Sequence, residues 1–231
     1  MNRRFRILSA LLHYPDEALR AALPEIAQAL LASGFTDRHA RALGRLARRL
    51  AAGELLDRQE TFSALFDRGR SCSLNLFEHV HGDTRNRGPA MVALVEAYHA
   101  AGWAPPTNEL PDYLPLFFEF LAVAPEQMTR DLLTQAAPIL DQLHARLAGR
   151  GTADSRAYAA VIAAALAEAG RAPEAPPAPA EDDDFEAIDR EWEAAPVTFG
   201  PENDPDKEGA RAKLGAMIDR LRKLRASQAI R

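Results

Sequence analysis

Apolar residues recur along the first 170 positions at the three- and four-residue spacing of helices, and no stretch alternates apolar and polar residues as a strand does. The first stripe runs from Ile7 to Leu12 and stops before the sequence HYP at positions 13–15. Further stripes of this kind occupy positions 19–30, 43–50, 62–66, 91–98, 132–147 and 154–169. The pattern predicts an all-α fold, with a single helical bundle as the domain.

Turn-forming residues mark the predicted helix ends. Gly34 follows the second stripe at the position where a helix ends, and Thr36 is a predicted N-cap for the next helix. Asp154 stands at the predicted start of the last helix of this region. Pro24 and Pro138 fall inside helical stripes, so we expect the helix to bend or divide at Pro24 and to kink at Pro138.

The composition changes after residue 170. Residues 1–170 carry 18 basic and 19 acidic side chains, residues 171–208 carry 3 and 13, and residues 209–231 carry 7 and 1. We therefore divide the chain into an all-helical domain at 1–170, an acidic, proline-rich and flexible segment at 171–207, and a basic amphipathic helix at 208–231. That terminal helix either folds back on the acidic segment, which we favour, or lies on a membrane surface.

Composition also narrows the function classes. Cys72 is the one cysteine, so no intrachain disulfide forms, and we predict a cytoplasmic protein. No segment reaches about 18 uncharged apolar residues, so we expect no integral membrane segment. A net charge of −5 disfavours a nucleic-acid partner.

Motifs of catalysis are missing from the sequence, which has no glycine-rich phosphate loop, no H-E-x-x-H, no C-x-x-C and no nucleophile elbow. A few candidate metal ligands gather in CSLNLFEHVHGDTRNRG, but the two histidines of a His-x-His pair on a helix point to different sides. We therefore favour structure or partner binding over a metal site, with Cys72 as a small buried residue and Arg85 and Arg87 paired with neighbouring carboxylates. The candidate ligands are Cys72, Glu78, His79, His81 and Asp83.

The segment ELPDYLPLFFEFL, residues 109–121, has more apolar residues than one buried face needs. Because proline is tolerated in the first turn, Pro111 and Pro115 predict a helix that begins near Leu110. One apolar stripe of this helix belongs to the core: Leu110, Leu114, Phe117, Phe118 and Leu121.

A second stripe of the same helix contains Tyr113, Leu116 and Phe120, with Asp112 and Glu119 beside it. Two interpretations are open. Either this face is the wall of a groove for a partner peptide, or the helix is buried on all sides and Asp112 caps its first turn.

Three segments resemble a known family: HVHGDTRNRGPAMVALVEAY, ELPDYLPLFFEFL and, further on, EWEAAPVTFG. They are similar to hallmark segments of the NarJ-type nitrate reductase molybdenum cofactor assembly chaperones, which belong to the redox-enzyme maturation proteins of the TorD-like superfamily. The similarity spans most of residues 1–200. In the third segment Ala195 stands where the pattern has an acidic residue.

The resemblance implies an all-helical, non-catalytic chaperone without a cofactor of its own. Its implied partner is the N-terminal segment of the nitrate reductase catalytic (alpha) subunit, which it holds while the molybdenum cofactor and an iron–sulfur cluster are inserted; it is not part of the mature enzyme. Carried over to this sequence, the family's central motif contains Glu109, Pro111, Asp112 and Glu119. Together with the second apolar stripe, this predicts a client-peptide site of Glu109, Asp112, Tyr113, Leu116, Glu119 and Phe120. The second family motif contains His81, Gly82, Arg85 and Arg87.

Two rival functions remain beside this one. The first is a helical metal- or cofactor-binding protein that uses His79 and His81. The second is a scaffold or regulator whose basic terminal helix docks on anionic lipid or an acidic partner.

Overall fold

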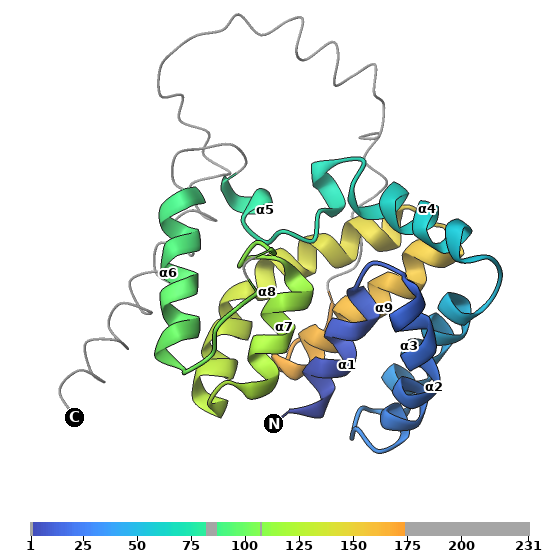
Figure 1. The fold of residues 1–231 in the computed structure, drawn as a ribbon, viewed down its shortest axis with the longest axis horizontal. Helices are drawn as coiled ribbons and strands as arrows, with labels where there is room; N and C mark the ends of the chain where they lie inside the picture. The colour runs from blue at the N-terminus through green and yellow to red at the C-terminus, as the bar shows by residue number, and fades with distance from the viewer. Residues whose placement is uncertain (1, 82–86, 107, 174–231) are drawn as a thin grey trace, which may run out of the picture.

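The computed structural model describes residues 2–81, 87–106 and 108–173 (Figure 1). Within these residues the chain is helical throughout and contains no strand, which confirms the all-α prediction. The helices are α1 (Arg3–Leu12), α2 (Glu17–Leu31), α3 (Asp37–Ala51), α4 (Leu55–Phe66), α5 (Glu78–His81), α6 (Arg87–Ala100), α7 (Leu114–Val123), α8 (Glu126–Gly149) and α9 (Ala153–Glu168), with a 3₁₀ turn η1 at Arg70–Cys72.

Side-chain caps explain several helix starts, because a helix begins where an oxygen accepts one of its unpaired backbone N–H groups. Asn2 caps α1, Asp16 caps α2 and Thr36 caps α3, as the sequence predicts for Thr36. The cap of α9 is Thr152, which accepts the N–H of Ser155, and Asp154 lies within the first turn instead. Gly34 has φ +75° in the turn after α2.

The core is built around α1, which packs on α7 and also contacts α2, α3 and α9. In turn α9 packs between α3 and α8, and Figure 1 shows these helices side by side. Alanine favours this close packing, since Ala164 and Ala165 of α9 are completely buried. Cys72 is also buried, as predicted.

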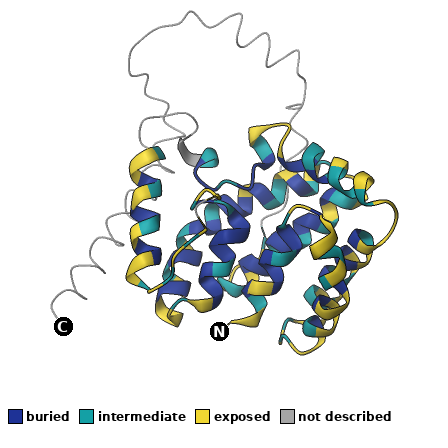
Figure 2. Ribbon diagram, in the orientation of Figure 1, coloured by how far each residue is buried: buried dark blue, intermediate teal, exposed yellow. Residues whose placement is uncertain are grey.

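Helix α7 is buried along most of its length, and Figure 2 shows it as almost uniformly buried. Leu114, Phe117 and Phe118 are completely buried, and so is Phe120 on another side of the helix. The helix begins at Leu114, one turn later than the sequence predicts. Its Pro115 lies in the first turn, where the missing N–H costs no hydrogen bond, whereas Pro111 precedes the helix in a turn.

Neither internal proline divides its helix, because α2 is continuous through Pro24 and α8 through Pro138. The segment at 171–207, which we predict to be flexible, lies outside the described residues from 174 onward, and the predicted basic helix at 208–231 lies outside them entirely.

Candidate functional site

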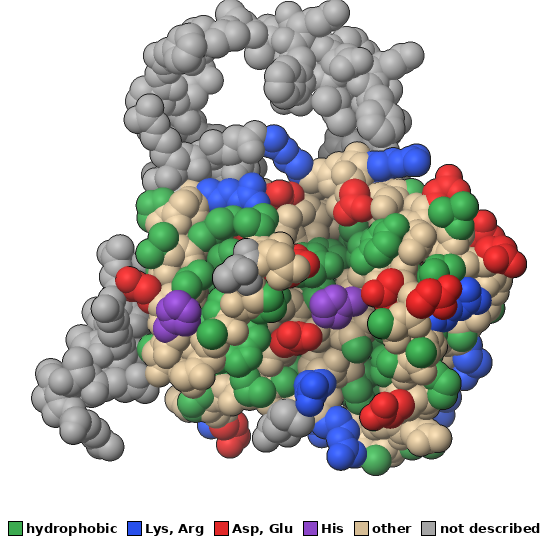
Figure 3. Space-filling view, viewed as in Figure 1, with side chains coloured by type: hydrophobic (Ala, Val, Ile, Leu, Met, Phe, Trp, Pro, Cys, Tyr) green, Lys and Arg blue, Asp and Glu red, His purple; other side chains and the backbone are tan. Residues whose placement is uncertain are grey.

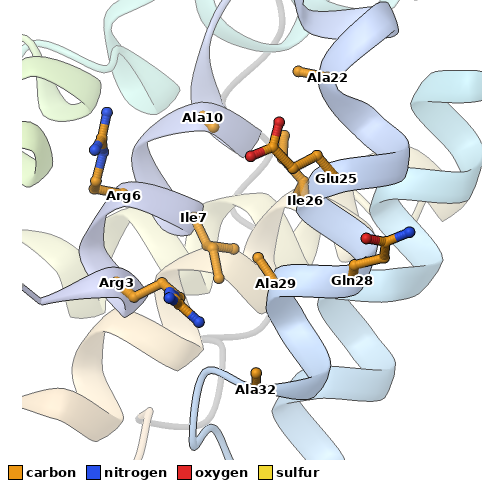
Figure 4. Close-up of a pocket in the computed structure, with 10 residues that line it drawn as sticks. All are labelled: Arg3, Arg6, Ile7, Ala10, Ala22, Glu25, Ile26, Gln28, Ala29 and Ala32. Atoms are coloured by element: carbon orange, nitrogen blue, oxygen red, sulfur yellow. The ribbon is translucent and has the colours of Figure 1, made fainter.

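A groove runs between α1 and α2, and Figure 4 shows the side chains that line its first half. Ile7 from α1 faces Ala29 from α2 across the gap, and Ile26 lies beside them. This half has a volume of about 590 Å³. Polar side chains border it: Arg3, Arg6, Glu25 and Gln28.

The second half of the groove, about 480 Å³, continues from the first, because both are lined by Ala10, Ala22 and Ile26. It extends past the end of α1 to Tyr113, at the start of α7. Figure 3 shows this side of the molecule, where hydrophobic side chains lie between acidic and basic ones. The remaining lining residues of this half are His13, Tyr14, Asp16, Ala18, Leu19 and Glu109.

Small side chains create the groove. Ala22 and Ala29 are seven residues apart, two turns along one face of α2, and Ala10 lies on α1. A larger side chain at any of these positions would fill the space between the two helices. We call this feature the α1–α2 groove. Its part along α1 is about 15 Å long, since α1 rises about 1.5 Å per residue over its ten residues.

The charges at the two ends of the groove differ in sign. Arg3 and Arg6 lie at the end that begins with α1. Asp16 and Glu109 border the opposite end. An elongated ligand with opposite charges at its two ends therefore fits the groove in one orientation.

Tyr113 forms part of the acidic end. Its pKa is raised to about 12, chiefly by burial and further by the carboxylates of Glu109 and Asp67. The phenol is therefore neutral and offers a hydrogen-bond donor next to an apolar surface. Its ring contacts the His13 imidazole edge to face, with the two ring centroids 6.4 Å apart.

His13 connects Tyr113 to Glu119. The Nε2 atom of His13 lies 3.6 Å from a Glu119 carboxylate oxygen, and both side chains are nearly half exposed. The pKa of Glu119 is lowered, first by the hydrogen bond with His13 and further by the charges of His13 and Arg6. Glu119 therefore keeps its negative charge next to the acidic end of the groove.

Two residues of the predicted client site do not reach the surface. Leu116 is 3% exposed and Phe120 is 0% exposed, so these two residues of the second stripe belong to the core, and only Tyr113 of that stripe borders the groove. Phe120 packs on Tyr98 and Trp103, with ring centroids 4.4 and 5.6 Å away. The prediction missed this because α6 and the chain after it cover that side of α7, and the spacing of apolar residues on one helix does not show what covers it.

Asp112 is also completely buried, and it does not cap α7. Its Oδ2 atom accepts the backbone N–H of Phe77 at 3.0 Å, and its backbone carbonyl accepts the N–H of Leu76. Leu114 in turn donates its N–H to the carbonyl of Leu74. Burial raises the pKa of Asp112, against the lowering effects of the Phe77 N–H and the Arg87 charge. Asp112 thus fastens the turn before α7 to the segment that directly precedes the second family motif.

The second motif is only partly described. Gly82 and Arg85 lie outside the described residues, and His81 is described only as the last residue of α5. Arg87 pairs with Glu78 at 3.3 Å, which confirms the predicted ion pair for this arginine.

His79 has a structural position in the same region. Its Nε2 atom donates to the carbonyl of Ser73 at 2.8 Å, and its Nδ1 atom accepts from Arg146 at 3.2 Å. Burial is the main cause of its lowered pKa. A neutral ring with both nitrogens bonded anchors α5 to α8.

In the described part of the chain, no three His, Cys, Asp or Glu side chains are placed to hold a metal ion. Asp83, one of the candidate ligands, lies outside it. None of the helices there is both long and apolar enough to cross a membrane.

Sequence reasoning missed most of the groove. It placed Ile7 and Ile26 on helix faces that pack on the core, which is correct, since they are 4% and 9% exposed. The missing signal was the set of alanines that face each other across α1 and α2. Alanine favours helices everywhere, so its presence does not indicate a surface hollow.

Comparison with known proteins gives consistent results. A family model described as nitrate reductase delta subunit matches residues 13–151. The nitrate reductase molybdenum cofactor assembly chaperone NarJ of Escherichia coli strain K12 is 42% identical over 200 residues, which cover 84% of this chain and 83% of that protein. The probable chaperone NarW of the same strain is 37% identical over 86% of this chain and 84% of its own length. The probable NarJ chaperone of Bacillus subtilis strain 168 is 32% identical over 62% of this chain and 77% of its own length.

The extent of the family match and the identity to these chaperones over most of their length lead to one conclusion: the chain belongs to the nitrate reductase delta subunit family, and within it to the NarJ-type molybdenum cofactor assembly chaperones.

Proposed function

We propose that this protein is a dedicated assembly chaperone of a respiratory nitrate reductase. In this proposal it binds the N-terminal segment of the catalytic subunit in the cytoplasm, holds the apoenzyme while molybdenum cofactor and an iron–sulfur cluster are inserted, and is absent from the mature enzyme. It performs no chemical step. The observation that carries the proposal is the α1–α2 groove in a member of this chaperone family.

The dimensions of the groove suit a short amphipathic helix. Its part along α1, about 15 Å long, corresponds to about three helical turns. Its floor is apolar, with Ile7 and Ile26 at the centre and alanines around them. A helix lays an apolar stripe into such a floor and leaves its polar face to solvent.

The charges suggest the direction in which the client lies. The N-terminal end of a helix carries a partial positive charge, and a chain terminus adds an amino group. Both are favoured beside Asp16 and Glu109. The opposite end of the client helix, with its free carbonyl groups, then meets Arg3 and Arg6.

This proposal changes the roles of the predicted site residues. Glu109 and Tyr113 contact the client directly, and Glu119 contributes charge beside them. Asp112, Leu116 and Phe120 are positioning residues, because they are buried and fix α7 and the turn before it. Substituting them therefore affects binding through the shape of the site.

Titration calorimetry with a synthetic peptide of the client N-terminus tests the proposal. Ala29→Leu fills the groove, so we expect it to weaken binding by about tenfold or more, as overpacking in a contact costs about 1–3 kcal/mol. Ala27→Leu is the matched control, because Ala27 is an exposed residue of the same helix that does not line the groove.

Both variants must retain the circular dichroism spectrum and melting temperature of the parent protein. Equal peptide affinity for parent and Ala29→Leu would place the client site elsewhere. Absence of binding to the parent protein would contradict the proposed client.

A further inference from the structure

Helix α3 carries a row of exposed arginines on one face. Arg38, Arg41, Arg45 and Arg48 are separated by three, four and three residues, which places them on one side of the helix. All four are exposed. The row is about 15 Å long at about 1.5 Å per residue. We call these four residues the arginine row.

The arginine row lacks counter-ions among the described residues. None of the four side chains forms an ion pair or a hydrogen bond there, although the neighbouring Arg49 pairs with Asp154 at 2.8 Å. Like charges three or four residues apart destabilise a helix by about 0.2–0.5 kcal/mol per pair. Arg38 and Arg41 also lie near the positive N-terminal end of α3. The row therefore favours an anionic partner.

The chain itself carries such a partner. Residues 181–193, EDDDFEAIDREWE, contain eight carboxylates and one arginine. Among the residues after 170 this is the most acidic stretch, and it lies outside the described residues.

The described part of the chain ends just past α9, which packs on both α3 and α8, and Arg171 there pairs with Asp141 of α8 at 2.6 Å. Arg4 bonds both Glu168, at the end of α9, and the carbonyl of Ser33, in the turn that leads to α3. At the opposite end, Arg49 pairs with Asp154. α3 and α9 are therefore antiparallel, and the C-terminal end of α9 lies near the end of α3 at which the arginine row begins.

The distance is short enough for contact. Glu181 is eight residues after Pro173, the last described residue. Extended chain spans about 3.3–3.6 Å per residue, so residue 181 lies within about 29 Å of Pro173. A segment tethered at this distance has a millimolar effective concentration, which makes several weak ion pairs sufficient for docking.

We propose that residues 181–193 dock along the arginine row of α3 and fasten the C-terminal region to the helical domain. Arginine suits this contact because its planar guanidinium binds a carboxylate through two hydrogen bonds. The contact does not depend on the client groove. It competes with pairing between the acidic segment and the basic residues of 209–231.

Trp192 lies within the docking segment and supplies a probe, because Trp103 is the only other tryptophan of the chain. In full-length protein with Trp103→Phe, time-resolved anisotropy measures the fraction of Trp192 that tumbles with the whole domain. We expect a large fraction at low salt and a small one at high salt. Arg41→Glu with Arg45→Glu should lower the ratio of docked to free segment by about tenfold.

The control is Arg68→Glu with Arg130→Glu, which changes the net charge equally at two exposed arginines outside α3. It should leave the Trp192 anisotropy unchanged. Asp182→Arg with Asp183→Arg should restore docking in the Arg41→Glu/Arg45→Glu protein, since the pairs are then reversed. A Glu-specific protease gives a second measurement on the unsubstituted chain, in which we expect cleavage at Glu186 and Glu191 to be several times slower than in the α3 variant.

Three results would overturn the proposal. The first is a Trp192 that tumbles freely in the parent at low salt. The second is docking that survives Arg41→Glu/Arg45→Glu and disappears on truncation after residue 208, which would assign the acidic segment to the basic tail. The third is a free Trp192 combined with binding of phosphatidylglycerol vesicles that requires Arg41 and Arg45, which would assign the row to lipid.

Discussion

Asp112 accepts the backbone N–H of Phe77 across 35 residues of sequence, at 3.0 Å and without access to solvent. This hydrogen bond joins the turn before α7 to the segment before α5. Tyr98 of α6 adds a third segment to this contact, because its hydroxyl donates to the carbonyl of Pro111 at 2.7 Å. The two motifs that mark the family in sequence are thus one packed unit in space.

We expect Asp112→Asn to make stability less dependent on pH. Burial raises the pKa of Asp112 above 3.8, so the folded state binds its proton more tightly than the unfolded state does. Stability therefore falls as pH rises through the folded-state pKa, and the asparagine variant lacks this loss. Its amide oxygen can still accept the Phe77 N–H. Urea unfolding from pH 4 to pH 7 measures the difference.

Asp112→Ala is the contrasting variant, because it leaves the Phe77 N–H buried without a partner. We expect a loss of about 1–3 kcal/mol in the free energy of unfolding at every pH. If alanine and asparagine behave alike, the hydrogen bond to Phe77 is not what Asp112 contributes.

Phe120→Ala should act on stability. The ring is completely buried against Tyr98 and Trp103, so its removal should cost about 3–5 kcal/mol in the free energy of unfolding. Val123→Ala on the same helix is the control, since Val123 is 48% exposed. Thermal and urea unfolding measure both. A Phe120→Ala protein as stable as the parent that fails to bind the client peptide would instead return Phe120 to the client site.

Charge substitutions at the two ends of the groove should distinguish the proposed direction of the client. Glu109→Gln should weaken binding of a peptide with a free N-terminal amine more than binding of its acetylated form. Arg3→Gln should affect both peptides equally. Calorimetry at several salt concentrations measures both variants, and the salt dependence should be flatter in each. If Arg3→Gln changed the affinity for one of the two peptides more than for the other, the client would lie in the groove in the opposite direction.

Glu119→Gln should remove a stabilising contribution that depends on pH. The hydrogen bond with His13 lowers the pKa of Glu119 below 4.5, so the contribution is present above that value and is lost as pH falls through the folded-state pKa. The effect is small because the carboxylate is 46% exposed. Unfolding between pH 3 and pH 6 should show a flatter profile than for Glu126→Gln, an exposed control.

Local features of the sequence were sufficient to predict much of the fold. The cap at Thr36 and the turn at Gly34 depend on neighbours a few residues away, and both were predicted correctly. The start of α7 was placed one turn early because Pro111 fits a first turn as well as Pro115 does. The long-range hydrogen bond from Phe77 to Asp112 decides between them, and periodicity does not report long-range pairing.

The candidate site was harder to predict. Glu109 and Tyr113 border the groove, but Leu116 and Phe120 belong to the core. A single helix shows an apolar stripe whether the stripe meets a partner or another helix of the same chain. The groove itself depends on the distance between α1 and α2, which the tertiary packing sets.

Helix α1 has consequences for reading substitution data on this protein. One side of its ten residues forms the floor of the groove, while the opposite side packs on α7, the helix of the family motif. A peptide bound in the groove contacts one side of α1, and a mutation that disturbs α7 affects the other side of the same helix. Weaker client binding by a variant of the motif therefore does not show that the substituted residue contacts the client. Only variants with an unchanged fold identify the residues that contact it.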